Sequence, residues 1–115
     1  MYKPNEPKTY TVEISVKNRQ VKCIVKEDGK VIEPPFKVAR KDKIEWTCDY
    51  AFAIHFPGIT PLGKGRIRSK KEEKPISTAV RNDAQPGCYK YFVAVEENGQ
   101  IWTDDPEFIV RPPKR

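Results

Sequence analysis

The sequence predicts an all-β domain, a Greek-key β-sandwich, on the basis of three observations. Apolar and polar residues alternate with a period of two in several short segments, which is typical of half-buried strands. Eleven prolines and six glycines divide the 115 residues into short pieces, and few windows hold apolar residues at helical spacing. Asp-Gly at 28–29 and Asn-Gly at 98–99 accept the positive φ angles of tight hairpin turns.

Three segments define the strand pattern most clearly. TYTVEISV at 9–16, QVKCIVKE at 20–27 and KIEWTC at 43–48 place apolar side chains at every second position. The prolines of IEPPF at 32–36 cannot donate ladder hydrogen bonds, so this segment cannot be the middle of a sheet. The expected strands are 9–16, 20–27, 36–39, 43–48, 51–56, 76–80, 88–95, 100–103 and 107–110.

The pattern indicates one domain at 9–112, between a flexible N-terminal tail at 1–8 and a short C-terminal tail at 113–115. A chain of 115 residues is long enough to bury a single core. Residues 57–75 are the one long irregular insertion, and at most one short helical turn is expected within 57–86. The expected core side chains are Ile14, Ile44, Trp46, Tyr91, Val93 and Ile109.

The basicity of the chain belongs to one loop and one tail. The net charge is +6, and residues 63–74 (GKGRIRSKKEEK) hold six basic and two acidic groups. The tail RPPKR holds three more cations. We expect 63–74 to be a solvent-exposed loop that could bind a polyanion or nucleic acid through phosphate contacts. Its cations are Lys64, Arg66, Arg68, Lys70, Lys71 and Lys74.

The sequence leaves the compartment open. No apolar run approaches the ~20 residues of a membrane span. The first ten residues contain no signal-peptide stretch, so the chain as written indicates the cytoplasm. A chain whose leader had been removed would look the same and would indicate the periplasm. Cys23, Cys48 and Cys88 are expected to be buried free thiols in a reduced compartment, or one disulfide and one free thiol after export.

Three segments in order carry a family resemblance. DKIEWTCDYAFAIHF (42–56) is an Ile-x-Trp strand followed by a strand with a histidine. AQPGCYKYFV (84–93) is a Pro-Gly-x-Tyr-x-Tyr strand, and DDPEFIVRP (104–112) is a short closing strand. Together they resemble the cupredoxin family, the plastocyanin-like β-sandwich. The resemblance covers about residues 9–112 and implies a cupredoxin-like fold.

Copper proteins of that family hold the metal with two histidines, one cysteine and usually a methionine, a set that suits both oxidation states of copper. The resemblance implies the first histidine at Phe52 or His55, the cysteine at Val93 and the second histidine at Glu96. No methionine follows Met1, and His55 is the only histidine. We therefore expect a metal-free sandwich with no cofactor and no type 1 copper site.

The alternative is a metal-binding or redox protein with an unorthodox site. Cys48 and His55 are seven residues apart, and on adjacent antiparallel strands they would approach one another. Two such ligands fall short of the four that a structural zinc site uses. His55 has no neighbouring nucleophile, and GKG at 63–65 lacks phosphate-loop spacing, so the chain is not expected to be an enzyme. The leading interpretation is a non-catalytic binding or interaction module.

The expected interaction surface has two parts. One is the basic loop, which the weaker nucleic-acid hypothesis uses. The other is an apolar rim at one end of the sandwich, where the resemblance implies docking of redox partners. An exposed rim of this kind predicts a protein partner or self-association. The rim comprises Phe52, His55, Phe56 and Pro57, together with Tyr89, Tyr91 and Trp102.

Overall fold

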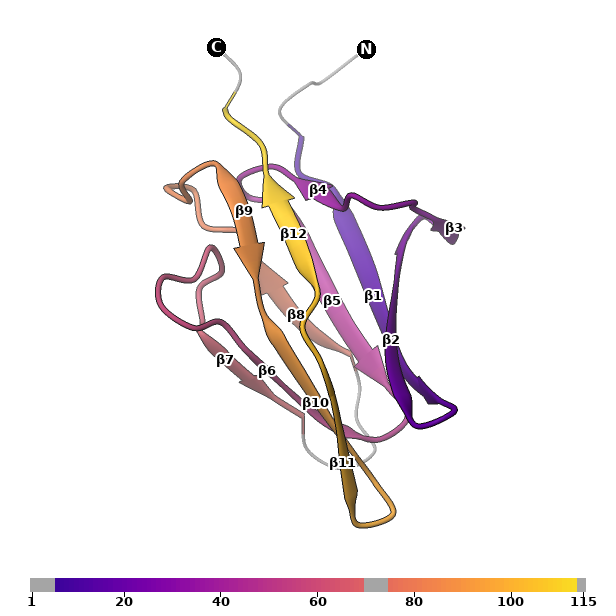
Figure 1. The fold of residues 1–115 in the computed structure, drawn as a ribbon. Coiled ribbons are helices and arrows are strands. Elements are labelled where there is room, and N and C mark those ends of the chain that lie inside the picture. The colour runs from indigo at the N-terminus through magenta and orange to yellow at the C-terminus, as the bar shows by residue number, and fades with distance from the viewer. Residues whose placement is uncertain (1–5, 70–74, 114–115) are drawn as a thin grey trace.

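The chain is all-β, as the sequence predicts. The computed structural model describes residues 6–69 and 75–113, and these contain twelve strands and no helix (Figure 1). Within these ranges no helix could therefore cross a membrane. The strands are β1 (Thr9–Lys17), β2 (Gln20–Glu27), β3 (Lys30–Val31), β4 (Lys37–Val38), β5 (Lys43–Cys48), β6 (Ala51–His55), β7 (Arg66–Arg68), β8 (Ile76–Ala79), β9 (Gly87–Lys90), β10 (Phe92–Glu97), β11 (Gln100–Asp104) and β12 (Glu107–Val110).

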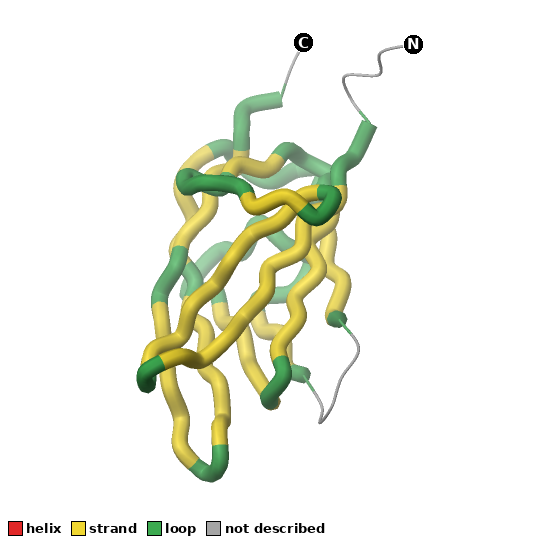
Figure 2. The backbone as a smooth tube through the Cα atoms, turned by 90° about the vertical axis from the view of Figure 1, so that its right-hand side faces the viewer, coloured by secondary structure: helices red, strands yellow, loops and turns green. Residues whose placement is uncertain are grey.

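The strands form two layers in a sandwich-like arrangement. One layer is the sheet β3-β2-β1-β5-β8, and the other contains the ladders β11-β10-β6-β7 and β4-β12-β9. The two ladders share one long hairpin, because β9 continues through Tyr91 into β10, and β11 continues through Pro106 into β12. The Tyr91 N–H donates to the Pro106 carbonyl at 3.0 Å and joins them. Figure 2 shows the far end of this hairpin projecting beyond the other strands.

The predicted tight turns are present. Asp28 has φ of +52° and Asn98 has φ of +51°, and the glycines that follow have +79° and +82°. Positive φ at both central residues is the geometry of a type I′ hairpin turn, so this prediction is confirmed. The turn between β1 and β2 uses Asn18 and Arg19 at +51° and +61° without any glycine. The type of this turn could not be predicted from the sequence, because, of its two central residues, Asn18 tolerates positive φ at low cost and Arg19 does not.

Two short strands, β3 and β7, are not predicted by the sequence. β7 lies inside 57–75, where irregular chain was expected, and it pairs antiparallel with β6. Its central residue, Ile67, is buried opposite Ile54, while Arg66 and Arg68 are exposed. The prediction of an irregular exposed loop is therefore wrong at 66–69, where Ser69 is buried as well. A single apolar residue between two arginines is too short a pattern to indicate a strand.

The buried cluster between the layers contains five of the six predicted core residues. Ile14, Ile44, Trp46, Tyr91 and Val93 are buried, and three of them are less than 1% exposed. Ile109 was predicted with them, but it is only half-buried, and its neighbours on the strand point inward instead. The segment Phe-Ile-Val is apolar at three consecutive positions, so its sequence does not define which face is buried.

The chain just before β1 is held at Asp42, whose side chain is buried. One Asp42 carboxylate oxygen accepts from the Lys8 N–H at 2.9 Å, and the other accepts from the Ala39 N–H at 2.8 Å. The Lys8 carbonyl accepts from the Lys43 N–H at 2.8 Å. The tail expected at 1–8 is therefore fixed at its last residue, and residues 1–5 lie outside the described part of the chain.

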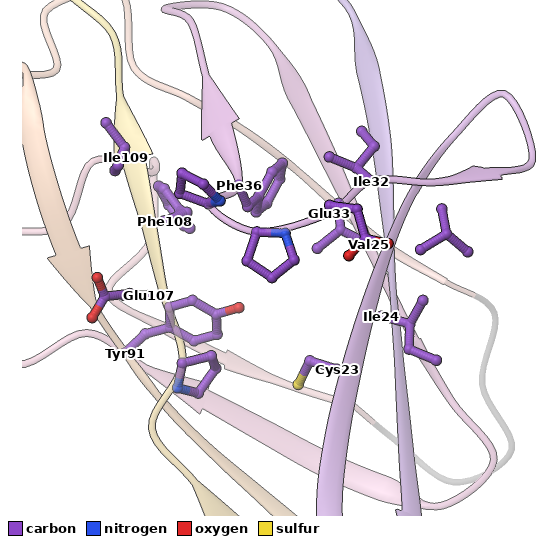
Figure 3. A pocket seen from close by; sticks show the side chains of 14 residues that line it. Cys23, Ile24, Val25, Ile32, Glu33, Phe36, Tyr91, Glu107, Phe108 and Ile109 are labelled. Carbon is purple, nitrogen blue, oxygen red and sulfur yellow. The ribbon is translucent and has the colours of Figure 1, made fainter.

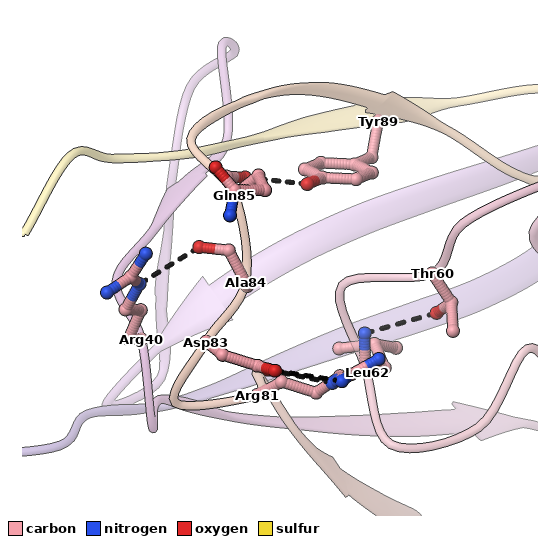
Figure 4. Close-up of polar contacts among 8 residues, drawn as sticks. All are labelled: Arg40, Thr60, Leu62, Arg81, Asp83, Ala84, Gln85 and Tyr89. Atoms are coloured by element: carbon pink, nitrogen blue, oxygen red, sulfur yellow. Dashed lines mark hydrogen bonds and ion pairs between the residues drawn. The ribbon is translucent and has the colours of Figure 1, made fainter.

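Irregular segments close one end of the two layers. Leu62 is fully buried, forms an isolated bridge with Val80, and donates its N–H to the Thr60 hydroxyl at 3.1 Å (Figure 4). Pro61 and Leu62 therefore anchor the 57–65 segment against the end of β8, while Ile59, at 80% exposure, faces solvent.

The loop before β9 is fixed in the same region. The Arg40 guanidinium donates through Nε to the Ala84 carbonyl at 2.9 Å, and the Tyr89 hydroxyl donates to the Gln85 carbonyl at 2.6 Å (Figure 4). These bonds tie the loop to the segment after β4 and to β9 itself. The long connection from β8 to β9 consequently has a defined course without a helix.

We predict that Trp46→Ala destabilises the fold by about 3–5 kcal/mol, the usual cost of removing a large buried aromatic side chain. Trp46 is fully buried, its ring meets that of Tyr91 edge-on at 5.4 Å, and its Nε1 donates to the Thr78 hydroxyl at 3.0 Å. Urea unfolding measures the change. Phe92→Ala is the matched control on an exposed aromatic and should stay within about 0.5 kcal/mol. Equal effects of the two changes would contradict the burial of Trp46.

Candidate functional site

The positions that the family resemblance assigns to copper ligands do not share a site. Val93 is fully buried in the core, whereas Glu96 is exposed. They are three residues apart on β10, so their side chains point to opposite faces. His55 is exposed on the outer face of β6, while Phe52 on the same strand is buried. Among the described residues no group of three His, Cys, Asp or Glu could hold a metal ion.

The expected approach of Cys48 to His55 rests on a pairing that does not occur. β5 pairs with β1 and β8, whereas β6 pairs with β10 and β7 in the other layer. Cys48 instead accepts a hydrogen bond through its sulfur from the Tyr50 N–H at 3.5 Å. Burial raises the pKa of the Cys48 thiol above its ordinary value. Cys48 and His55 therefore do not lie on adjacent antiparallel strands, and the prediction that they approach one another on such strands is wrong.

The predicted apolar rim is largely buried. Phe52 and Phe56 are 5% and 3% exposed, because alternation along β6 carries both rings into the core. The Phe56 ring lies 5.2 Å from that of Tyr91 and 5.8 Å from that of Phe108. Of the predicted rim, His55 and Pro57 remain exposed. The prediction of an exposed aromatic surface at Phe52 and Phe56 is wrong.

The basic segment is only partly described. Lys64, Arg66 and Arg68 are exposed, and the two arginines are held in position by β7. Lys70 and Lys71, which belong to the predicted interaction surface, lie outside the described residues.

All three cysteines are free, but their environments differ. Cys23 and Cys48 are half-buried, while Cys88 is exposed and donates through its sulfur to the Glu107 carboxylate at 3.1 Å. Cys88 was predicted to be buried with the other two. Its strand is apolar at neighbouring positions, but Cys88 itself falls on the outer face, opposite to Val93.

The feature that the sequence does not reveal is a cleft between the two layers. It has a volume of about 720 Å³ and opens along the side where β2 faces β12. Its walls are mainly apolar, and they include Val25, Ile32, Phe36, Pro106 and Phe108 (Figure 3).

Prolines on both sides of the cleft explain why the layers are separated there. Pro34 and Pro35 lie in the segment that crosses from β3 in one layer to β4 in the other. This segment is fixed at its ends, because Ile32 donates its N–H to Val25 and Phe36 accepts from the N–H of Ile109, both at 2.8 Å. Since prolines cannot donate ladder hydrogen bonds, none of the strands in the described ranges fills this side of the sandwich.

Two polar side chains line the cleft from opposite walls. The Tyr91 hydroxyl extends into the cleft toward the side that carries the Cys23 thiol (Figure 3). Burial raises the pKa of Cys23 from its ordinary value of 9.0 to about 12, and the Asp104 carboxylate adds to this effect. Burial also raises the pKa of Tyr91 well above its usual range, with smaller contributions from Cys23 and Asp104. Both groups therefore stay protonated and uncharged at neutral pH.

The acidic residues of the cleft are not matched by basic ones. Glu33 and Glu107 are the charged residues among those that line it, and no lysine, arginine or histidine of the described part of the chain does so. The Glu107 side chain points away from the cleft in Figure 3 and accepts from Cys88.

Comparisons with known proteins assign neither a family nor a function to the chain. No protein-family model matches the chain, and no curated protein matches it in sequence. The functional hypothesis therefore rests on the cleft and on the exposed residues of the protein surface.

We predict that the protein loses stability as the pH rises from about 9 to about 12, partly through Cys23. The unfolded thiol releases its proton near its ordinary pKa of 9.0, while the folded thiol holds its proton until about 12. The contribution of Cys23 to the free energy of unfolding is therefore fully present below pH 9.0 and is lost as the pH rises toward about 12. Urea unfolding across this pH range should show a shallower decline for Cys23→Ala than for the wild type. Identical slopes would mean that the folded thiol is not shielded from solvent.

Proposed function

We propose that this protein is a non-catalytic binding module that takes up a small apolar molecule in the cleft between its layers. One observation carries the proposal, namely an apolar-walled cleft of about 720 Å³ between two strand layers. Binding sites for small molecules are typically concave, mostly apolar and roughly 300–1,000 Å³ in volume, with a few polar groups that orient the ligand.

The chemistry of the cleft favours binding over catalysis. A cysteine acts as a nucleophile through its thiolate, and a pKa of about 12 keeps Cys23 in the thiol form. Tyr91 likewise keeps its proton, so it can donate a hydrogen bond but is a poor base. A metal or redox function at His55 has no geometric support, because Cys48 lies on a strand of the other layer.

We further propose that the sandwich is a Greek-key, cupredoxin-like domain without copper. The chain crosses between layers from β3 to β4, from β4 to β5, from β5 to β6, from β7 to β8 and from β8 to β9. These crossings produce the parallel pairs β1 with β5 and β4 with β12, which a simple meander would not contain. Val93 and Glu96, at the positions of the family's cysteine and second histidine, support the metal-free assignment.

Polyanion binding is a second candidate function, and the outer face of the second layer favours it. Register places Phe92 opposite His55 and His55 opposite Arg66, all exposed. In the next row on this face, Ala53 pairs with Arg68. Directly opposite side chains are close neighbours on a sheet face, so an aromatic ring, an imidazole and two guanidinium groups gather there. Phosphate contacts from arginine with a base stacked on an aromatic ring are typical of single-strand binding.

The cleft proposal predicts saturable binding of N-phenylnaphthylamine, an uncharged fluorescent probe, with one site per chain. Val25→Trp should weaken this binding at least about tenfold, because the indole would occupy the space of the probe. Ile101→Trp is the matched control, since Ile101 is 67% exposed and does not line the cleft. Fluorescence titration measures both, with circular dichroism to verify folding. Unchanged binding by a folded Val25→Trp variant would place the probe elsewhere.

The polyanion proposal predicts that Arg66→Ser with Arg68→Ser lowers the salt concentration at which the protein elutes from heparin. Fewer cation–phosphate or cation–sulfate contacts release fewer counterions. Stability should stay within about 0.5 kcal/mol, because both side chains are exposed. The control is Lys17→Ser with Lys22→Ser, which removes two exposed cations from the other layer. Equal losses in the two double variants would show that only net charge matters.

A further inference from the structure

The Tyr91 hydroxyl is the unusual group of the cleft. Tyr91 is 2% exposed, and no hydrogen bond joins its hydroxyl to another of the described residues. Among the described residues, every side-chain oxygen or nitrogen that is fully enclosed has a hydrogen-bond partner. The Tyr91 hydroxyl has none, so it is not fully enclosed, and it is accessible from the cleft that the Tyr91 side chain lines. Water that enters the cleft can bond this hydroxyl, and a ligand that displaces such water loses affinity unless it offers an acceptor in its place.

We propose that the cleft selects an uncharged molecule with an apolar body and a carbonyl or ether oxygen that accepts a hydrogen bond from Tyr91. This inference rests on the proposed function and specifies its ligand class. The Tyr91 ring is fixed by contacts with the rings of Trp46 at 5.4 Å and Phe108 at 5.7 Å. The hydroxyl therefore has a defined position in the cleft, on the wall across from Cys23 (Figure 3).

The charges around the cleft act against anionic ligands. Within residues 6–69 and 75–113 no cation lines it to pair with a carboxylate, whereas Glu33 does line it. The Asp104 carboxylate is close enough to raise the pKa of both Cys23 and Tyr91. A carboxylate buried there would lose its hydration without gaining an opposite charge, which is unfavourable. Fatty acids and other anionic amphiphiles are consequently excluded from the ligand class.

Three probes of similar shape test this selectivity, namely acetylnaphthalene, ethylnaphthalene and naphthoate. Each competes with N-phenylnaphthylamine, and its affinity is obtained from the displaced fluorescence. The wild type should bind acetylnaphthalene best and naphthoate least. Tyr91→Phe keeps the ring and removes the hydroxyl, so the affinity for acetylnaphthalene should fall about five- to tenfold, the effect of losing one hydrogen bond between uncharged groups. The affinity for ethylnaphthalene should not change.

Tyr10→Phe is the matched control. Tyr10 is also buried, at 3% exposure, but does not line the cleft. This variant should bind all three probes as the wild type does. If Tyr91→Phe weakens acetylnaphthalene and ethylnaphthalene equally, the hydroxyl only supports the shape of the cleft and the inference is overturned. Tightest binding of naphthoate, or no effect of Tyr91→Phe, overturns it too. If no probe binds to the wild type, the proposed function itself fails.

Discussion

The packing of Tyr91 between the two layers is the interaction on which the rest of the structure depends. Its ring contacts Trp46 from one layer and Phe56 and Phe108 from the other, at centroid distances of 5.4, 5.2 and 5.7 Å. Its backbone N–H bonds to the Pro106 carbonyl at the point where the long hairpin is interrupted. One residue thus joins the layers through its side chain and the two ladders through its backbone. Aromatic contacts of this kind add to the free energy gained by burying the rings.

The same residue links the core to the cleft. Its ring is enclosed by aromatic neighbours, whereas its hydroxyl lies where the prolines of the 32–36 segment and Pro106 keep strands from closing the sandwich. A buried aromatic ring with a polar group at its tip suits the boundary between an apolar core and a binding site. The core therefore holds in place the group that we propose to orient the ligand. Cys23, on the opposite wall, is shielded by the same arrangement and remains a thiol.

The outer face of the second layer is separate from the cleft. Alternation along β6, β7 and β10 sends Phe52, Ile54 and Ile67 inward and leaves His55, Arg66 and Phe92 outside. The two candidate surfaces accordingly share no side chains. A substitution at Arg66 or Arg68 can alter the charge of the outer face without disturbing the apolar walls of the cleft.

The local features of the fold could be predicted from the amino-acid sequence, because they depend on neighbouring residues. Period-two alternation located most strands, the Asp28 and Asn98 turns were recognisable from the glycines after them, and Trp46 and Val93 were correctly placed in the core. Where the local pattern was ambiguous it failed, as in the consecutive apolar residues around Ile109 and in the single apolar residue of β7. The cleft, in contrast, could not be predicted, because it exists only in the folded arrangement of the two layers. The cleft places Cys23 and Tyr91 on facing walls, although they are far apart in the sequence. It forms where prolines from two distant segments keep the layers from pairing, and no local sequence pattern encodes such a long-range arrangement.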